Sequence, residues 1–276
     1  MTDQIRTGRV LVNAVPTAYL EAGDPEATPL VLLHDGAFGS DSRLCWEELI
    51  PLLSGEYRVL APDLLGHGGT AKLFFFDTDP LSQRINHIAA FCEVLGLDRP
   101  AFAGASFGGG MVLRGAADGK LPMRAGVSIS GPGGLHMIPE QFAQLQDYEP
   151  SKEAAGRILE KFVAEVTDDA ARRRFESSMT PGHWETLSAA RLRNPSAEAG
   201  AHDFRPAYRE ALGGITVPIL LIAGGDDPLL DKGWATEMAR LIPGARAEEI
   251  AGCRHLPQLD RPAEIARLVR QFLAAA

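Results

Sequence analysis

The chain has 276 residues, enough for one large domain or for one domain with an inserted subdomain. Its net charge is −9 and no stretch is rich in lysine and arginine, so we expect neither nucleic acid nor a membrane as a partner. The three cysteines are widely spaced, which predicts neither a disulfide framework nor a zinc site. The sequence has no apolar signal region and no run of membrane-spanning length, and we predict a cytoplasmic protein.

Short apolar runs alternate with longer amphipathic stretches through the first half of the chain. The runs predict strands, and the stretches between them predict helices. Strands are predicted at 29–33, 57–61, 100–104 and 125–129, and helices at 45–53, 80–95 and 107–117. Continuous apolar strands separated by helices are typical of a mostly parallel sheet that is covered on both faces.

The pattern changes after residue 134, where the sequence becomes helical and highly charged. Helices are predicted at 141–148, 152–166, 168–178 and 184–193. Strand character returns at 217–223 and near 245–250, and a last helix is predicted at 262–272. A helical block between two strands of one sheet is typical of a cap over the strand ends. We therefore predict a core of residues 1–136 and 213–276 with a helical cap of residues 137–212, and a separate helical domain is the alternative.

The sequence GASFG, residues 104–108, carries the strongest chemical signal. It fits a G-x-S-x-G pattern between an apolar strand and a helix, and in that context the pattern marks a nucleophile. A sharp turn there would push the Ser106 side chain outward, and the two glycines would let neighbouring backbone pass close by. We therefore predict that Ser106 is the nucleophile of an enzyme.

A serine hydroxyl becomes a good nucleophile only when a base takes its proton, so a histidine must lie beside it in the fold. His255 is the candidate, because it follows a late strand and stands in a loop before the last helix. Other histidines rank lower as bases. These are His67 in a Gly-rich turn, His183 and His202 in or beside the cap, and His136, a weaker candidate for the pocket.

The base in turn needs a carboxylate that orients it, and the order Ser…Asp…His along the chain is typical of this arrangement. The segment GGDDP, residues 224–228, ends the strand that returns from the cap, so both of its aspartates lie at the carboxyl edge of the sheet. Only one of two adjacent acids can point at the imidazole. We predict Asp227, with Asp226 as the alternative and Asp231 as a weaker one.

Charge that develops on a carbonyl oxygen needs an oxyanion hole, usually made of two backbone N–H groups. One is expected from Phe107, directly after the nucleophile. The other is expected from the loop after the first buried strand, HDGAFG, where Gly36 is the candidate. The alternative is that this loop is only a turn rich in small residues.

These motifs together resemble the α/β-hydrolase superfamily over almost the whole chain. The turn DLLGHGGT, residues 63–70, is similar to the family's D-x-x-G-x-G-x-S turn, and HLPQLDRP, residues 255–262, is similar to its histidine loop. The resemblance implies the α/β-hydrolase fold, a mostly parallel eight-stranded sheet flanked by helices with an inserted helical cap.

Within the superfamily the chain looks most like the meta-cleavage product hydrolases, which split a carbon–carbon bond in vinylogous keto acids. The similar segments are GPGGL at 131–135, Phe162, and the RFE sequence at 174–176. The resemblance implies that Arg174 contacts the substrate carboxylate, for which a guanidinium is well suited, and that Phe162 also contacts the substrate. The alternative is that the run of arginines at 172–174 is a solvated face of a cap helix.

The chain departs from that group at four positions of the pocket and its loops. Ala105 replaces an Asn and Leu256 replaces a Trp, while Asp35 and Arg254 stand where glycines are usual. The first two departures change residues of the pocket that would bind a dienoate, so they bear on whether the substrate is the same.

The leading hypothesis is a serine hydrolase of a small carbonyl substrate that cleaves a C–C bond in a vinylogous keto acid or β-ketone. A carboxylesterase or lactonase is the alternative, followed by a cofactor-free lyase or perhydrolase and by a ligand-binding protein on the same scaffold. No metal or organic cofactor is predicted, because the sequence has no ligand cluster or dinucleotide fingerprint. Similar enzymes are commonly homodimers, so a homodimer is the assembly that the resemblance suggests.

Overall fold

A central sheet organises the computed structural model, which describes residues 5–76, 79–189 and 205–276. Its strands are β1 (Arg6–Val12), β2 (Val15–Ala22), β3 (Pro29–Leu33), β4 (Arg58–Pro62), β5 (Ala101–Ala105), β6 (Ala125–Ile129), β7 (Ile219–Gly224) and β8 (Arg246–Ile250). They lie in the order β1-β2-β4-β3-β5-β6-β7-β8. Only the β1–β2 and β2–β4 pairs are antiparallel in this sheet. The predicted mostly parallel, eight-stranded sheet is confirmed.

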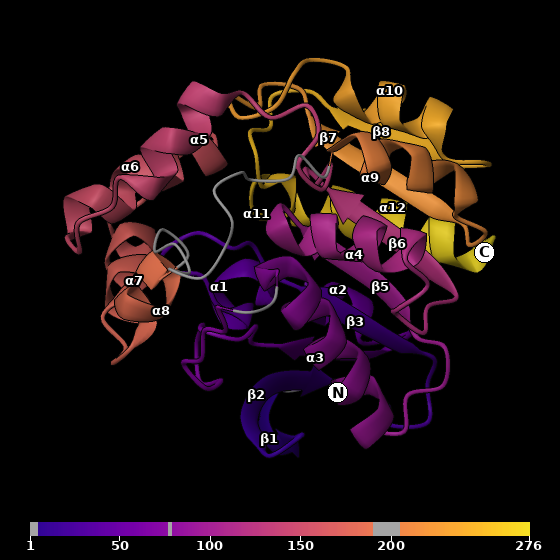
Figure 1. Cartoon of the computed structure of the whole chain (residues 1–276), viewed down its shortest axis with the longest axis horizontal. Coiled ribbons are helices and arrows are strands. Elements are labelled where there is room, and N and C mark those ends of the chain that lie inside the picture. The colour runs from indigo at the N-terminus through magenta and orange to yellow at the C-terminus, as the bar shows by residue number, and fades with distance from the viewer. Residues whose placement is uncertain (1–4, 77–78, 190–204) are drawn as a thin grey trace.

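The inner strands are buried on both faces of the sheet. Every residue of β5, β6 and β7 is buried, which is why these strands have continuous apolar sequences. In β3, Leu30 and Leu32 join the core on one face, and Val31 and Leu33 join the core on the other. Helices α3 (Pro80–Val94) and α4 (Phe107–Ala117) pack on the Val31 face and lie in front of the sheet in Figure 1. The opposite face is covered by α1 (Ser42–Trp46), α2 (Ile50–Leu53) and α12 (Pro262–Ala274).

A second group of helices lies beside the sheet rather than on either face of it (Figure 1). It consists of α5 (Pro139–Gln146), α6 (Lys152–Phe162), α7 (Asp168–Ser178) and α8 (His183–Ala189). The group contacts the loops that follow β3 and β8. Arg174 of α7 hydrogen-bonds to the first of these loops, and the Phe162 carbonyl accepts a hydrogen bond from Leu256 in the second. These helices therefore face the carboxyl ends of the parallel strands.

The observed helices differ from the predicted ones at several boundaries. The helix predicted at 45–53 is two short helices, because Pro51 cannot donate the hydrogen bond that would continue the first one. The helix α6 ends at Phe162 rather than at 166, because Val163 takes an extended conformation. Residues 190–193 of the predicted fourth cap helix lie outside the described residues, as does His202.

The last helix before β7 lies apart from the α5–α8 group. α9 (Arg205–Ala211) and the short 3₁₀ helix η1 (Leu212–Gly214) contact α4. The division into core and cap at residues 136 and 212 stays a prediction. Among the described helices, none is long and apolar enough to cross a membrane.

Candidate active site

Ser106 stands on the sharp turn between β5 and α4. Its φ is +53°, a conformation that costs energy for a residue with a Cβ and that persists only where the surroundings enforce it. The two flanking glycines make the turn possible. A Cβ on Gly104 would lie 2.2 Å from the Gly108 carbonyl oxygen, and one on Gly108 would lie 2.1 Å from the Leu33 carbonyl oxygen. The sequence pattern GASFG thus gives the strand–turn–helix geometry that it predicts.

His255 and Asp227 complete a continuous line of hydrogen bonds to Ser106. The Ser106 Oγ lies 2.8 Å from His255 Nε2, and His255 Nδ1 lies 2.8 Å from Asp227 Oδ2. The other carboxylate oxygen of Asp227 accepts a hydrogen bond from the Leu229 N–H, which fixes its orientation. Because an ionised carboxylate can only accept, the imidazole carries its proton on Nδ1 and offers Nε2 to the serine hydroxyl. The neighbouring Asp226 is exposed and takes no part in this line.

Gly36 and Phe107 lie against each other beside Ser106. A Cβ on Gly36 would be 2.8 Å from the Phe107 Cβ, so only glycine allows this approach. Within the described part of the chain, neither backbone N–H has a hydrogen-bond acceptor. Phe107 also opens α4, where the helix dipole favours negative charge. The two N–H groups can therefore receive a developing oxyanion.

A cavity of about 560 Å³ opens onto Ser106. Its polar wall residues besides Ser106 are His67, Arg84 and Gln146. The rest of its wall is Gly36, Ala37, Phe38, Pro80, Phe107, Met137, Phe142, Leu145, Phe162 and Leu187. A second cavity of about 320 Å³ also reaches Ser106 and is bounded by the GPGG backbone at 131–134. A small, mainly apolar molecule fits this space.

Phe162 forms part of the cavity wall beside the base. Its ring centroid lies 5.4 Å from that of His255. The Leu256 N–H donates to the Phe162 carbonyl, and the Asp260 carboxylate accepts from the N–H groups of Ala164 and Arg254. The end of α6 is thus bound to the histidine loop, which fixes the position of the imidazole.

Arg174 does not line the cavity, contrary to the role expected from the resemblance. Its side chain is buried, with Nη2 2.9 Å from Asp35 Oδ1 and Nε donating to the Phe38 carbonyl at 2.9 Å. The guanidinium also lies over the ring of Phe162, 5.0 Å from its centroid. The physical reason for the difference is the buried Asp35 carboxylate, which pairs with the guanidinium and draws it into the loop after β3.

Asp35 remains ionised in this pair. Burial raises the pKa of its carboxyl, but the Arg174 guanidinium and the hydrogen bond from the Ser40 hydroxyl lower that pKa below its ordinary value. The carboxylate accepts from the Ser40 Oγ at 2.7 Å and from the Ala37 N–H at 3.0 Å. The ion pair is therefore neutral as a whole, and it holds the loop that carries Gly36.

Arg84 is the functional candidate that the sequence reasoning missed. It lies on α3, lines the cavity, and is only 7% exposed. Burial lowers the pKa of its guanidinium to about 10, so the group stays charged at neutral pH. A signal was present in the sequence, because residues 81, 85, 88 and 92 form an apolar helix face and Arg84 interrupts it.

Three buried histidines form a cluster that includes His34 of the Gly36 loop. The ring centroids of His34 and His67 are 4.9 Å apart, and those of His67 and His183 are 5.2 Å apart. His183 links three elements, because its Nε2 accepts from the Gly39 N–H and its Nδ1 donates to the Gly66 carbonyl. Burial lowers the pKa of His183 to about 4, so this bridging ring is neutral.

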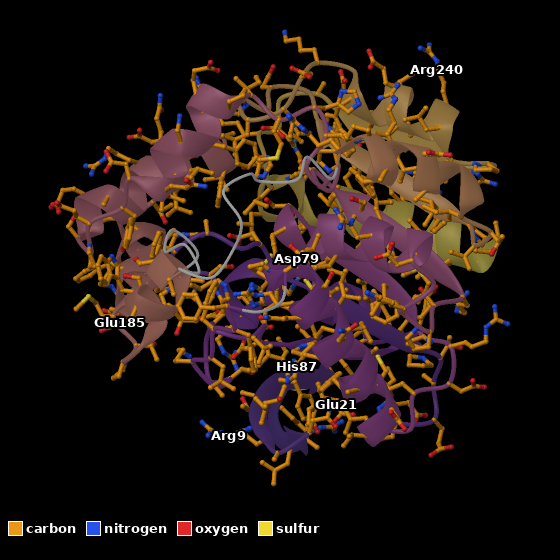
Figure 2. All side chains as sticks on the ribbon, in the orientation of Figure 1. Arg9, Glu21, Asp79, His87, Glu185 and Arg240 are labelled. Atoms are coloured by element: carbon orange, nitrogen blue, oxygen red, sulfur yellow. The ribbon has the colours of Figure 1, made fainter. Side chains whose placement is uncertain are left out.

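Acid is expected to destabilise the fold through such histidines. Burial also lowers the pKa of His87 on α3 (Figure 2) to about 4. Because an unfolded histidine binds its proton near pH 6.5, the unfolded state holds more protons between pH 6.5 and about 4. The free energy of unfolding should therefore fall as the pH falls through that window, by up to about 1.4 kcal/mol per pH unit for each histidine.

Urea unfolding at several pH values measures this dependence. In His183→Gln the amide can replace the hydrogen-bond acceptor without binding a proton. The free energy of unfolding should therefore depend less steeply on pH, because one histidine fewer takes up a proton on unfolding. A wild-type stability that is flat or rises as the pH falls from 6.5 to 4 would contradict the expectation.

Comparisons with known proteins agree with this geometry. Residues 30–268 match the family described as the alpha/beta hydrolase family. The chain belongs to this family. The hydrolase is 27% identical to the 2-hydroxy-6-oxo-2,4-heptadienoate hydrolase of Pseudomonas putida over 274 residues, 96% of this chain and 95% of that protein. It is also 27% identical to a 2-hydroxymuconate semialdehyde hydrolase of a Pseudomonas species, over 90% of this chain and 87% of that one.

A solved structure of a meta-cleavage product hydrolase from Pseudomonas fluorescens is similar along nearly the full length of the hydrolase. The TM-score is 0.83 at 25% identity, and the match covers 97% of both chains. The resemblance to meta-cleavage product hydrolases is therefore confirmed.

Proposed function

We propose that this hydrolase cleaves a carbon–carbon bond next to a carbonyl group in a vinylogous keto acid or β-ketone, with Ser106, His255 and Asp227 as its catalytic residues. The observation that supports the proposal best is the line of two 2.8 Å contacts from Asp227 through His255 to Ser106, which ends at a cavity. The relatives named above point to the same reaction class. The proposal needs no metal or organic cofactor.

His255 would act as the proton carrier in this reaction. Its Nε2 takes the proton either from Ser106, which then attacks the carbonyl carbon, or from a water that Ser106 positions. The carbonyl oxygen becomes an oxyanion held by the N–H groups of Gly36 and Phe107. When the C–C bond breaks, the departing carbon takes a proton from His255, and the carbonyl carbon keeps the oxygen from serine or water. On the water route this gives the free acid. On the serine route it leaves an ester on Ser106, which a water deprotonated by His255 then hydrolyses to the acid and the free serine. In a dienol substrate, ketonisation first makes the departing carbon a better leaving group.

Helices α5–α8 would act as the cap over this site. Phe142 and Leu145 of α5, Phe162 of α6 and Leu187 of α8 contribute to the cavity wall. An apolar cover of this kind excludes water from the oxyanion hole and so strengthens its hydrogen bonds. The substrate would lie with its carbonyl at Ser106 and with apolar parts against Phe162.

A carboxylesterase or lactonase is the second candidate, and one observation favours it. Arg174, the arginine that the resemblance assigns to a substrate carboxylate, is paired with Asp35. Ala105 and Leu256 add no polar group to the site. The same serine, histidine and oxyanion donors serve an ester equally well.

The two candidates are separated by comparing a dienoate meta-cleavage product with a short p-nitrophenyl ester under the same conditions. C–C hydrolysis predicts rapid bleaching of the dienoate and weak ester cleavage, with both reactions lost in Ser106→Ala. Rapid ester cleavage with an inert dienoate would favour the esterase instead. A Ser106→Ala variant as active as the wild type on either substrate would overturn both.

A further inference from the structure

Arg84 places a buried positive charge on the part of the cavity wall that α3 contributes. The guanidinium of Arg84 donates from Nε to the Leu65 carbonyl at 3.2 Å and from Nη1 to the Pro80 carbonyl at 3.1 Å. Both acceptors are neutral, and in the described part of the chain the Nη2 group has no acceptor and Arg84 belongs to no ion pair. The guanidinium of this cavity-lining residue therefore keeps donors without a protein acceptor.

The neighbourhood of Arg84 gives only partial compensation for the buried charge. The guanidinium carbon lies 5.5 Å from the centroid of the Phe107 ring, a distance at which the ring face attracts a cation. Asp79 is the carboxylate that acts on Arg84 through space, but its side chain is engaged in capping α3 through the Ser82 N–H. Burying a cation without a bonded carboxylate is costly, so a ligand that supplies the negative charge would be bound strongly.

Among the described residues that line the 560 Å³ cavity, Arg84 is the only charged cation. Arg114 lines the second cavity, where its guanidinium lies 4.9 Å from the centroid of the Tyr208 ring. Arg174 is outside the wall and neutralised by Asp35. Burial, with the neighbouring His34, His183 and Arg84, holds the pKa of His67 well below its ordinary value, so that wall residue is neutral as well. Since the chain has a net charge of −9, a local positive group would offset the repulsion that an anionic substrate meets on entering.

We propose that Arg84 is the specificity-determining residue of the site and binds a carboxylate of the substrate, remote from the carbonyl that reacts at Ser106. This inference rests on the proposed function and deepens it, because it assigns the acid-binding role to α3 of the core instead of to Arg174. The substrate class is a carbonyl compound with a carboxylate at its far end. Phe107 connects the two ends, because its backbone N–H faces the oxyanion and its ring faces Arg84.

The test uses p-nitrophenyl half-esters of succinate, glutarate and adipate, each compared with its methyl-capped form. The measured quantity is kcat/KM for the free acid divided by kcat/KM for the capped diester of the same length. Wild type should favour the free acid at one length or more. Arg84→Gln should lower this ratio by about 10- to 100-fold, the usual effect of a charge-assisted hydrogen bond, and Arg84→Lys should retain part of it.

Arg240→Gln is the matched control for the change in net charge. Arg240 is exposed on α10 (Trp234–Leu241) and lies at the outer edge of the molecule in Figure 2, so its removal should leave the ratio as in wild type. A ratio that is the same in wild type and Arg84→Gln would overturn the proposal, provided that Ser106 is required for turnover. So would a wild type that favours the capped esters at all three lengths.

A binding measurement keeps the inference separate from the proposed function. Titration calorimetry of Ser106→Ala with monomethyl glutarate and dimethyl glutarate needs no turnover. If Ser106→Ala binds the acid and the double variant with Arg84→Gln does not, the role of Arg84 is supported. This holds even if no substrate is hydrolysed, and in that case only the proposed function fails. Equal binding of the acid with and without Arg84 overturns the inference. Thermal melting of each variant checks that it folds.

Discussion

Replacing Ser106 with alanine is expected to lower kcat by at least about 10⁴-fold on any substrate that the wild type turns over well. Alanine removes the hydroxyl that His255 would activate as the proposed base, and it leaves the backbone N–H groups of Gly36 and Phe107 and the cavity in place. KM should change little, because Phe162 and the rest of the apolar cavity wall remain. Steady-state kinetics of the purified variant measures both constants.

The positive φ of Ser106 makes a stability control necessary, since alanine must adopt the same strained turn. Ser54→Ala removes a buried hydroxyl at the end of α2, away from the cavity, and should keep the wild-type kcat. If Ser106→Ala is folded and retains more than about a tenth of the wild-type kcat, Ser106 is not the nucleophile.

Asp227→Asn should cost about 10⁴-fold in kcat, although the two side chains have nearly the same shape. An amide N–H placed at His255 Nδ1 requires that nitrogen to be an acceptor, which moves the imidazole proton to Nε2. The ring can then no longer take the proton of Ser106. The effect should appear in kcat at neutral pH and leave the melting temperature nearly unchanged.

Asp226→Asn is the control for this variant, because it makes the same chemical change at the adjacent, exposed residue. It should alter kcat by less than about threefold, as expected for a surface substitution away from special features. The assignment of the acid fails if the two variants exchange these results, or if Asp227→Asn behaves like the wild type.

The sequence predicted those parts of the molecule that depend on local patterns. β5, β6 and β7 are buried on both faces, so their apolar runs are unmistakable. The hairpin of β1 and β2 was not located in advance, because β1 is largely exposed and its turn residues, Asn13 and Ala14, carry no strong turn signal. Both have positive φ, which is ordinary for Asn and unusual for Ala.

Ser106, His255 and Asp227 could be proposed together because each follows a recognisable strand. The carboxyl ends of neighbouring parallel strands lie at one edge of the sheet, so chain order alone brings these residues close. The contacts of Arg174 could not be predicted in this way. Its partner Asp35 is 139 positions away, and only the packing of α7 on the loop after β3 brings the two together.

Arg84 was overlooked for a related reason. A sequence pattern can reveal that a charged residue interrupts an apolar helix face, but not whether the charge meets a carboxylate, reaches solvent or faces a cavity. Deciding among these outcomes needs the neighbouring loop at Leu65 and the ring of Phe107, which come from separate segments of the chain.

Covalent labelling reports whether Ser106 is activated, and it does not depend on the identity of the substrate. The protein is treated with a fluorophosphonate and the modified residue is located by peptide mass spectrometry. We expect one adduct per chain, on Ser106, formed much more slowly in His255→Gln and in Asp227→Asn. An adduct on another residue, or labelling of Ser106 at the same rate in all three proteins, would show that His255 and Asp227 do not activate Ser106.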